Sequence, residues 1–441
     1  MLRAKCLYIT LGCAKNEVDT DRMRALLSAA GVDECAEAAE ADIALVNTCS
    51  FLAAATQESI ETTLELAQEA QEGVRELPIV MCGCVPSRYG EDLAEELPEV
   101  AAFVPAQDED NIVAVVREVL GREAENGAGC RPEVLRTIQG ASAFVKISDG
   151  CDRFCTFCAI PYIRGRYHSR EADEILAEVA TLMEGGVREV VLIGQDTGVW
   201  GSDLGGDQSL AGLLRQVAEV VRPYRGWVRV LYLQPEGMTD DLVSVLRDVD
   251  EVLPYIDIPI QHCSARLLKR MNRSGSADEL RALFARLRSE IPNLVLRSTG
   301  MVGFPGETEE EFEELVAFIG EQEFDYTSVF AYSQEDGTAA ARMRDQVDEE
   351  TKVERAQTLM DVAEQLGFAA TAQHVGETVD VIIDGVEETD EGPELIGHAW
   401  FQAPDSDGAV HIEWGEATVG DVVRCKLVDS FCYELIGVME G

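Results

Sequence analysis

The sequence is poor in basic residues. Its 441 residues hold 36 Lys and Arg against 82 Asp and Glu, which gives a formal net charge of −46. Because an acidic surface repels phosphate backbones, this balance argues against broad electrostatic capture of nucleic acid and favours basic proteins as partners. Adaptation of the whole surface to salt is the alternative interpretation, since only six of the basic residues are Lys.

Long hydrophobic runs are missing as well. No apolar stretch reaches the roughly 18 residues of a membrane-spanning helix, and the start MLRAKCLYIT lacks the apolar core of a signal peptide. We therefore expect a cytoplasmic protein that does not enter a membrane. Thiols stay reduced in that compartment, so the 13 cysteines, an odd number, indicate metal ligation more than disulfides.

Residues 1–125 alternate short apolar runs with amphipathic stretches. The runs CLYIT, IALVN and PIVMC have the length of buried parallel strands. Between them, EVDTDRMRALLSAAG and QESIETTLELAQEA space their apolar residues as helices do. This alternation predicts an N-terminal α/β domain built on a parallel sheet. The Gly- and charge-rich stretch 121–133 is the expected linker.

Residues 137–370 repeat a strand–helix pattern about six times. The strand candidates are AFVKIS, EVVLIG, VRVLYL, YIDIPI, LVLRSTGMV and TSVFAY. In one intervening stretch, the apolar residues that fall on a single helical face are Ile175, Val179, Leu182 and Met183. The repetition predicts a partial (β/α)6 TIM-like barrel, whose chemistry is expected at the C-terminal ends of its strands.

Residues 371–441 lose the helical pattern. The runs TVDVIIDG, LIGHAWF, AVHIEW, DVVRCKLVDS and YELIGVM are short and are separated by turn residues. Five such strands predict a small β-barrel of OB type. The expected fold class is therefore α/β with an additional small β domain.

Three cysteines stand close together in GCDRFCTFCAIPYIRGR, directly after the first predicted barrel strand. Cys151, Cys155 and Cys158 can supply thiolates, the ligands that zinc and iron–sulfur clusters use. A structural zinc site would need a fourth nearby ligand, and His168 is the local candidate. A thiol–disulfide exchange site is a weaker alternative, because no thioredoxin-like frame surrounds the C-x-x-C pair.

The C-x-x-x-C-x-x-C loop at the opening of a βα barrel resembles the signature of the radical S-adenosylmethionine superfamily. The resemblance implies that Cys151, Cys155 and Cys158 hold a 4Fe-4S cluster with one open iron. That iron would bind the amino and carboxylate groups of S-adenosylmethionine. The resemblance also implies that Phe157 packs near the adenine, for which simple core packing is the alternative.

Two further loops stand where this resemblance places cofactor contacts. Gly194, Gln195 and Asp196 follow the second barrel strand, where the superfamily contacts the methionine amino group. Gly303 and Gly306, in GFPGET, would allow the backbone to approach the cofactor closely. A tight turn before a capped helix is the alternative interpretation of this second loop.

Three more cysteines, Cys13, Cys49 and Cys84, follow strands predicted in the N-terminal segment. The C-terminal ends of parallel strands meet at one edge of a sheet, so we expect these thiols to converge on one metal site. Cys82 competes with Cys84, but it should still belong to the strand. Chance placement of buried cysteines is the alternative.

The motifs LGCAKNEVDTDRM, NTCSF and CGCVPSRYG, together with the three-thiol loop and the C-terminal barrel, resemble the methylthiotransferases over almost the whole chain. The resemblance implies an N-terminal cluster domain (1–125), a radical S-adenosylmethionine domain (137–370) and a TRAM β-barrel (371–441). It implies two 4Fe-4S clusters, S-adenosylmethionine, and an electron donor such as flavodoxin or ferredoxin. In that family the first cluster binds the transferable sulfur, which one S-adenosylmethionine methylates. A second S-adenosylmethionine molecule is cleaved to a radical, and this radical abstracts hydrogen from an unactivated carbon.

The remaining polar candidates receive no catalytic assignment. His262 ends a barrel strand, where it would either line the pocket or be a satisfied polar residue. The cysteines that we assign to structure or chance are Cys6, Cys35, Cys82, Cys130, Cys263, Cys425 and Cys432.

Two branches of the methylthiotransferases compete as the closer match. One modifies an adenosine in transfer RNA, and the other modifies the β-carbon of an aspartate in the small-subunit ribosomal protein S-twelve. The stretches GCAKNEVDTDRM, FLAAATQESI and QDTGVWG resemble the ribosomal-protein branch. A zinc-stabilised RNA- or protein-binding module is the alternative from another class.

Charge supports the ribosomal-protein branch. Residues 371–441 contain sixteen Asp or Glu against Arg424 and Lys426, a charge of −14 in 71 residues against −32 in the preceding 370. A barrel that grips RNA should be basic, whereas one that grips a basic ribosomal protein gains from acidity. We therefore predict a methylthiotransferase acting on ribosomal protein S-twelve, with transfer RNA the less favoured substrate. The acids expected to dock the protein include Glu387, Glu388, Asp390 and Glu391.

Overall fold

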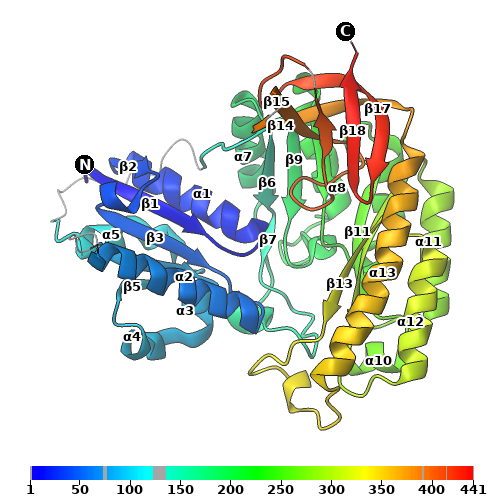
Figure 1. The fold of residues 1–441 in the computed structure, drawn as a ribbon, viewed down its shortest axis with the longest axis horizontal. Coiled ribbons are helices and arrows are strands. Elements are labelled where there is room, and N and C mark those ends of the chain that lie inside the picture. Colours follow the sequence, from blue (N-terminus) through cyan, green and yellow to red (C-terminus); the bar gives the residue numbers. More distant parts are fainter. Residues whose placement is uncertain (1, 73–76, 123–135, 390–391, 414, 441) are drawn as a thin grey trace. The chain divides into compact units, whose positions relative to one another are not determined.

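The computed structural model describes the chain as two compact units (Figure 1). The N-terminal unit comprises Met1–Ile138, Asp149–Asp152 and Cys158–His168. The C-terminal unit comprises Gln139–Ser148, Arg153–Phe157 and Ser169–Gly441. Within these limits the residues that the structure describes are 2–72, 77–122, 136–389, 392–413 and 415–440. The expected linker lies largely outside them, and the domain limits inferred from the sequence stay predictions.

The N-terminal unit is built on a five-stranded parallel sheet with the strand order β2-β1-β3-β4-β5. Three of the strands were predicted, whereas β2 and β5 were not, because VDEC is polar and VAAFVP contains small residues. The strands are β1 (Ala4–Thr10), β2 (Val32–Cys35), β3 (Ile43–Thr48), β4 (Ile79–Gly83) and β5 (Val100–Pro105).

Helices cover both faces of this sheet. Met23 and Leu27 of α1 join Ile112 and Val116 of α5 in one apolar cluster, whereas Leu66 of α2 packs in a separate cluster with other strand residues. The two-sided covering explains why the central strands β3 and β4 are buried along their whole length. The helices of this unit are α1 (Ala14–Ala29), α2 (Ala53–Glu72), α3 (Cys84–Tyr89), α4 (Leu93–Glu96), α5 (Ile112–Val119) and α6 (Ile160–Ile163).

The C-terminal unit begins with six parallel strands that match the six predicted runs. They form two three-stranded sheets with the orders β10-β9-β6 and β11-β12-β13. These strands are β6 (Ser142–Lys146), β9 (Glu189–Ile193), β10 (Trp227–Val230), β11 (Tyr255–Gln261), β12 (Val295–Val302) and β13 (Tyr326–Ala331). The two-residue strands β7 (Ser148–Asp149) and β8 (His168–Ser169) flank the three-cysteine loop in sequence.

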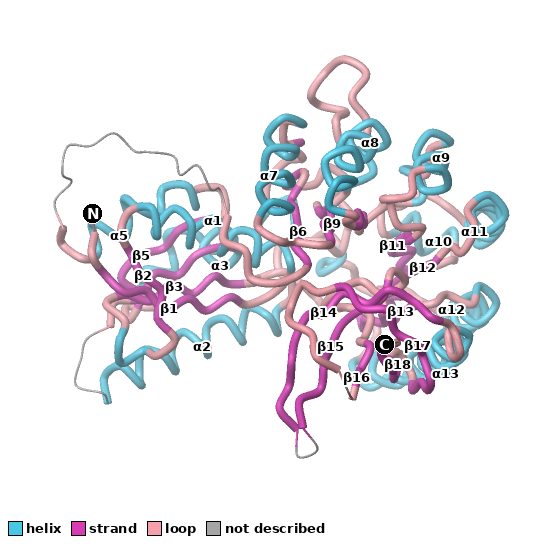
Figure 2. Tube along the Cα trace, turned by 90° about the horizontal axis from the view of Figure 1, so that it is seen from above, coloured by secondary structure: helices cyan, strands magenta, loops and turns pink. Residues whose placement is uncertain are grey.

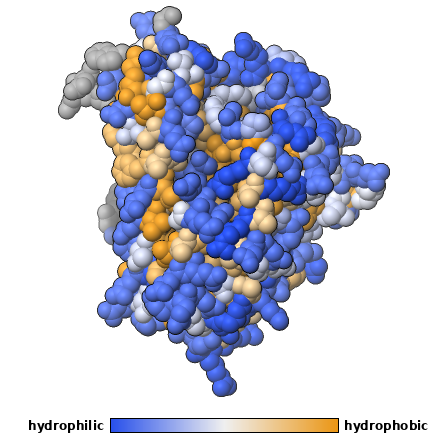
Figure 3. Space-filling model, turned by 90° about the vertical axis from the view of Figure 1, so that its right-hand side faces the viewer, coloured by the Kyte–Doolittle hydropathy of each residue, from blue (hydrophilic) through white to orange (hydrophobic). Residues whose placement is uncertain are grey.

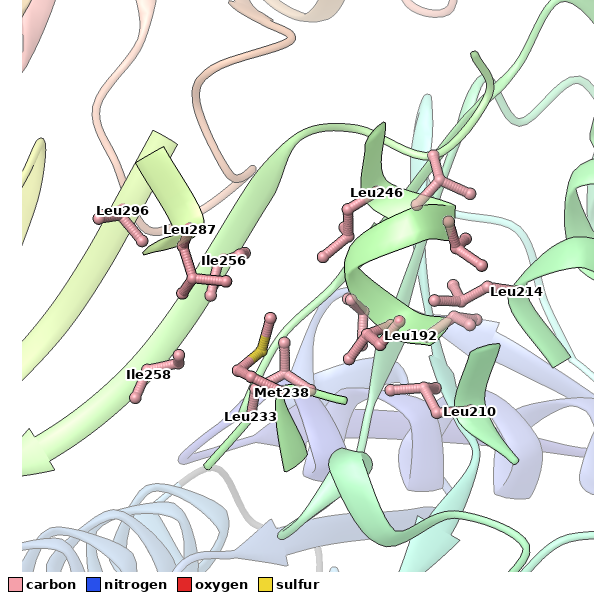
Figure 4. Packing of buried hydrophobic residues seen from close by; sticks show 14 of the residues in the cluster. Leu192, Leu210, Leu214, Leu233, Met238, Leu246, Ile256, Ile258, Leu287 and Leu296 are labelled. Carbon is pink, nitrogen blue, oxygen red and sulfur yellow. The ribbon is translucent and has the colours of Figure 1, made fainter. Parts of the chain in front are cut away.

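Helices lie on the outer side of these strands, as Figure 2 shows for α7, α8, α9, α11 and α12. The four residues expected on one face of α7 are all buried, which confirms that helix. In Figure 4, Leu192 of β9 lies near Leu214 of α8 and Leu246 of α9, within the core between strands and helices. The helices are α7 (Ala172–Glu184), α8 (Leu210–Val221), α9 (Asp240–Asp248), α10 (Ala265–Arg270), α11 (Ala277–Glu290), α12 (Glu309–Gln322) and α13 (Glu349–Gln373).

After α13 the chain forms a closed five-stranded barrel with the order β14-β15-β16-β18-β17, which confirms the predicted small β domain. The hairpin of β14 and β15 extends beyond the rest of this barrel (Figure 2). The strands are β14 (Thr378–Thr389), β15 (Gly392–Ala399), β16 (Val410–Ile412), β17 (Val422–Phe431) and β18 (Glu434–Met439).

A buried ionic network joins the small barrel to the parallel strands. His398 of β15 lies between Asp384 (2.5 Å) and Glu189 of β9 (2.9 Å), and Glu189 also pairs with Arg229 of β10 at 2.6 Å. Burial alone would lower the pKa of His398, but the two carboxylates raise it to about 9. Burial opposes ionisation of Glu189, yet Arg229 and His398 lower the pKa of this carboxyl to about 2. The small barrel is thus fixed to the strand that precedes the Gly194 loop.

In the part of the chain that the structure describes, no helix is both long and apolar enough to cross a membrane.

Candidate functional site

Cys13, Cys49 and Cys84 lie at one edge of the N-terminal sheet. Cys49 directly follows β3, Cys84 directly follows β4, and Cys13 stands between β1 and α1. The register pairs Thr10 with Asn47 and Thr48 with Gly83, so these three neighbouring strands end level with one another. The predicted convergence of the three loops on one sheet edge is what the structure shows.

Asn16 ties these loops together. Its Nδ2 donates to the carbonyl oxygens of Leu11 (2.8 Å) and Thr48 (2.9 Å), which come shortly before Cys13 and Cys49. The thiol of Cys84 lies 3.9 Å from the Oδ1 atom of the same side chain. A single fully buried amide therefore contacts all three loops that carry the cysteines.

Two glycines make the close approach of the loops possible. Gly12 has φ +105°, and a Cβ added to it would lie 2.6 Å from the Cβ of Cys49. Gly83 has φ +89°, and its Cβ would lie 2.2 Å from Oδ1 of Asn47. Any larger residue would push the loops apart, so both glycines are needed where they stand.

The three thiols also interact electrostatically. Burial raises the pKa of the Cys84 thiol to about 11 and raises that of Cys49, and the neighbouring thiols add to both shifts. The positive charge of Arg164 opposes these shifts at both thiols. Cys13 is exposed, which leaves one side of the group open to a ligand.

The donor chemistry of these three thiols suits an iron–sulfur cluster. Among the residues whose positions are described, no three His, Cys, Asp or Glu side chains are arranged to hold one metal ion. A cubic iron–sulfur cluster holds its cysteines farther apart than one ion does, because each thiolate binds a different iron. The thiolate donor set, the open side and the nearby cation therefore fit a cluster.

The three-cysteine loop lies where the two units divide, with Cys151 and Cys158 in the N-terminal unit and Cys155 in the C-terminal unit. The backbone N–H of Cys151 donates to the carbonyl of Gly165 at 3.2 Å. Burial raises the pKa of the Cys155 thiol, whereas Arg273 and Arg153 lower it. All three cysteines are partly exposed, and their role as ligands stays a prediction.

The loop after β9 holds a buried carboxylate. Asp196 is 2% exposed, and its Oδ2 accepts a 2.5 Å hydrogen bond from Arg153. Its Oδ1 is buried and accepts no hydrogen bond from the described residues, so this atom can accept one from an ammonium group. Burial raises the pKa of Asp196, although Arg153 opposes the shift. A Cβ added to Gly194 would lie 2.4 Å from Oγ of Ser148, so a larger residue there would displace this hydroxyl.

The glycine-rich loop after β12 is held by Glu307. Its Oε2 accepts hydrogen bonds from the backbone N–H of Gly303 (2.7 Å) and from Arg355 (2.6 Å). Its Oε1 lies 3.3 Å from Nε2 of His262, which is fully buried. Nδ1 of His262 accepts two backbone N–H groups, whereas its buried Nε2 makes no hydrogen bond with the described residues, so the role of this histidine stays a prediction. Gly306 has a φ of +80°, the conformation that favours glycine.

Phe157 packs in a small apolar cluster of the C-terminal unit. Its partly buried ring contacts the group that includes Phe304, from the glycine-rich loop, and Tyr332. Core packing is therefore part of its role, and contact with an adenine stays a prediction.

The other cysteines are those assigned to structure or chance. Cys6 and Cys82 are buried in the core of the N-terminal sheet, and Cys82 belongs to β4 as expected. Cys263 and Cys425 are also buried, whereas Cys35 and Cys432 are partly exposed. The cysteines that the structure describes form no disulfide, and Cys130 lies outside them. His168, the zinc candidate, is exposed.

Sequence reasoning missed several polar residues around the thiols. Asn16 and Arg164 contact the N-terminal loops, and Arg153 and Arg273 lie near Cys155. Arg164 follows Cys158 in the run IPYIRGR, and Asn16 follows Cys13 in GCAKNE. The cysteines are the recognisable signal in both stretches, and the two polar residues carry none of their own. Nothing in a single sequence shows which polar residue near a cysteine turns inward.

Three family models match separate parts of the chain. Residues 5–105 match the family described as Uncharacterized protein family UPF0004, residues 145–319 the Radical SAM superfamily, and residues 375–439 the TRAM domain. The solved structure of the radical S-adenosylmethionine methyltransferase TsrM from Kitasatospora setae has a TM-score of 0.57 at 15% identity, covering 74% of this chain and 72% of that chain. OxsB, a cobalamin-dependent S-adenosylmethionine radical enzyme, reaches 0.52 at 11% identity, covering 81% and 56%. These two structures support the fold.

Curated relatives are much more similar in sequence. A ribosomal protein uS12 methylthiotransferase RimO from Geobacter sulfurreducens is 41% identical over 99% of this chain and 98% of its own length. The RimO protein of Bdellovibrio bacteriovorus is 38% identical over 98% and 97%, and that of Synechococcus sp. WH7803 is 39% identical over 98% and 93%. The chain belongs to the RimO family of radical S-adenosylmethionine methylthiotransferases.

Proposed function

We propose that this protein adds a methylthio group to the β-carbon of an aspartate in ribosomal protein uS12. The relatives named for that activity match the chain from end to end at about 40% identity. The proposal includes a cytoplasmic location, where ribosomal proteins reside, and an electron donor of the flavodoxin or ferredoxin type.

The convergence of Cys13, Cys49 and Cys84 on one sheet edge carries the proposal. A radical S-adenosylmethionine enzyme needs one cluster for its radical chemistry, so a second three-thiol site calls for another role. Three thiols leave one iron of a 4Fe-4S cluster without a protein ligand, and that position can bind a sulfur species. Sulfur transfer is the reaction that uses such a position.

The three-cysteine loop and the loops after β9 and β12 would hold S-adenosylmethionine. Cys151, Cys155 and Cys158 would bind the other 4Fe-4S cluster, which supplies the electron for reductive cleavage of S-adenosylmethionine. The remaining contacts come from the loops after β9 and β12 and from the aromatic ring beside the third cysteine. They are Phe157, Gly194, Gln195, Asp196, Gly303 and Gly306, of which Asp196 offers its unpaired Oδ1 to the ammonium group.

The acidic C-terminal barrel would dock the protein substrate. Glu387 of β14 stands directly opposite Glu394 of β15, and like charges at such positions destabilise a hairpin. The destabilisation caused by these two facing negative charges is explained if the hairpin binds a basic partner. The face of the molecule seen in Figure 3 is mostly hydrophilic, with interrupted apolar stripes.

The direct test is the reaction itself. Anaerobically reconstituted protein is given S-adenosylmethionine, reductant and either ribosomes with unmodified uS12 or unmodified transfer RNA. We expect the mass of uS12 to increase by one methylthio group in place of one hydrogen, and the transfer RNA nucleosides to stay unchanged. Methylthiolated adenosine with unmodified uS12 would overturn the proposal.

Charge reversal on the hairpin should weaken capture of the substrate. Glu387→Lys with Glu388→Lys is expected to lower the association rate with uS12 by about tenfold at low salt, because solvent-facing charges act mainly on the rate of encounter. Both side chains are exposed. The next acids in sequence, Asp390 and Glu391, lie outside the described residues. Association is measured by surface capture of uS12 at several salt concentrations.

The matched control is Glu313→Lys with Glu314→Lys, which makes the same change in charge on exposed residues of α12. The control should bind uS12 as the unmodified protein does. Formation of 5′-deoxyadenosine without substrate should be unchanged in both variants. Equal binding by the hairpin variant and the unmodified protein would mean that the acidity is a general surface property.

A further inference from the structure

A buried arginine, Arg164, lies close to Cys84 of the N-terminal triad, because both contact Oδ1 of Asn16, although it follows Cys158 by only six residues in sequence. The segment Cys158–His168 belongs to the N-terminal unit. The Arg164 side chain is only 2% exposed. A buried cation is costly unless it has specific partners, so its contacts indicate what it does.

Each arm of the Arg164 guanidinium has a different kind of partner. One terminal nitrogen donates to Asp19 at 2.7 Å and lies 3.3 Å from Asp149, which comes two residues before Cys151. The other donates to Oδ1 of Asn16 at 2.8 Å. The charge is therefore held by carboxylates on one side and by the amide that joins the cysteine loops on the other.

The contact with Asn16 fixes the orientation of that amide. With Oδ1 accepting from Arg164, Nδ2 is left to donate to the backbone beside Cys13 and Cys49. The Cys84 thiol donates to the same Oδ1 atom. Arg164 thus supports the two contacts by which the Asn16 amide holds the loops of Cys13 and Cys49.

The charge of Arg164 lies close to the three-thiol site, because its guanidinium and the Cys84 thiol contact the same Oδ1 atom of Asn16. Three thiolates on one cluster bring negative charge into a buried site, where an uncompensated charge is expensive. A nearby cation stabilises the more negative state of such a site.

We propose that Arg164 is the positioning residue and internal counter-charge of the N-terminal three-thiol site, where it stabilises the reduced, more negative state of the cluster. The inference rests on the proposed function, which places a 4Fe-4S cluster at these thiols. Arg164, which follows the three-cysteine loop in sequence, thus has a role at the N-terminal three-thiol site.

A redox titration tests the inference on the full-length chain. The parent carries Cys151→Ala, Cys155→Ala and Cys158→Ala, so that only the N-terminal site can bind a cluster. Adding Arg164→Gln should shift the reduction potential of the remaining cluster to more negative values, because a positive charge beside it is lost. Adding Arg164→Lys should keep the potential near that of the parent. Iron content and the electron paramagnetic resonance signal are measured on each sample.

The matched control is Arg136→Gln, which removes another largely buried arginine paired with α1, through Asp21 at 2.9 Å. It should leave the potential unchanged. If Arg164→Gln loses iron, restoration of iron by Arg164→Lys supports the inference, whereas equal loss in both variants overturns the role of charge. The inference is also overturned if the cluster in Arg164→Gln has the same reduction potential as the cluster in the parent. A parent chain without iron would instead overturn the N-terminal cluster itself, and this inference with it.

Discussion

Replacing Cys151, Cys155 and Cys158 together by alanine is expected to abolish both formation of 5′-deoxyadenosine and methylthio transfer, and to leave about half of the iron. Two cubes account for about eight irons per chain, and each depends on its own three thiols. The three residues are partly exposed, so their loss should cost little folding stability. Iron per chain and 5′-deoxyadenosine are measured after anaerobic reconstitution.

A matched variant separates ligand loss from a general effect of removing thiols. Cys35→Ala with Cys432→Ala removes two partly exposed cysteines that lie outside both triads, and it should keep about eight irons and full activity. If the variant of the three-cysteine loop bound no iron at all, Cys13, Cys49 and Cys84 would not form an independent site.

Replacing Cys13, Cys49 and Cys84 by alanine should have the complementary effect. The variant is expected to release 5′-deoxyadenosine under strong reductant, because the residues assigned to S-adenosylmethionine lie outside this triad. It should form no methylthiolated uS12, because the position that would bind the transferable sulfur is gone. Both products are measured by mass spectrometry in the same reaction.

Single variants test which cysteine of β4 and α3 belongs to the triad. Cys84→Ala should lose the N-terminal iron, whereas Cys82→Ala should retain it, because Cys82 is packed in the core of the sheet. The triad assignment fails if the triple variant still transfers sulfur at the normal rate.

Much of the fold could be predicted because its strands are short apolar runs separated by polar or amphipathic stretches. The six barrel runs and the five C-terminal runs all became strands. The two missed strands, β2 and β5, are edge strands with polar or small residues, so they lack the pattern of a buried strand. Their place in the sheet is set by pairing with neighbours far away in sequence.

The convergence of the N-terminal cysteines could also be predicted, since each follows a parallel strand. The polar residues that organise them could not. Asn16 acts through the carbonyl oxygens of Leu11 and Thr48, which meet only after β1 and β3 have paired. Arg164 lies nearly 150 residues from Asn16 in sequence, and no local pattern marks such a contact.

The most direct test of the central claim compares cells with and without the gene for this protein. Mass spectrometry is applied to uS12 and to transfer RNA nucleosides from both strains. The account predicts that uS12 from the deletion strain lacks the methylthio group on one aspartate, while every transfer RNA nucleoside is unchanged. Fully modified uS12 in the deletion strain, or loss of a methylthio group from transfer RNA, would contradict it.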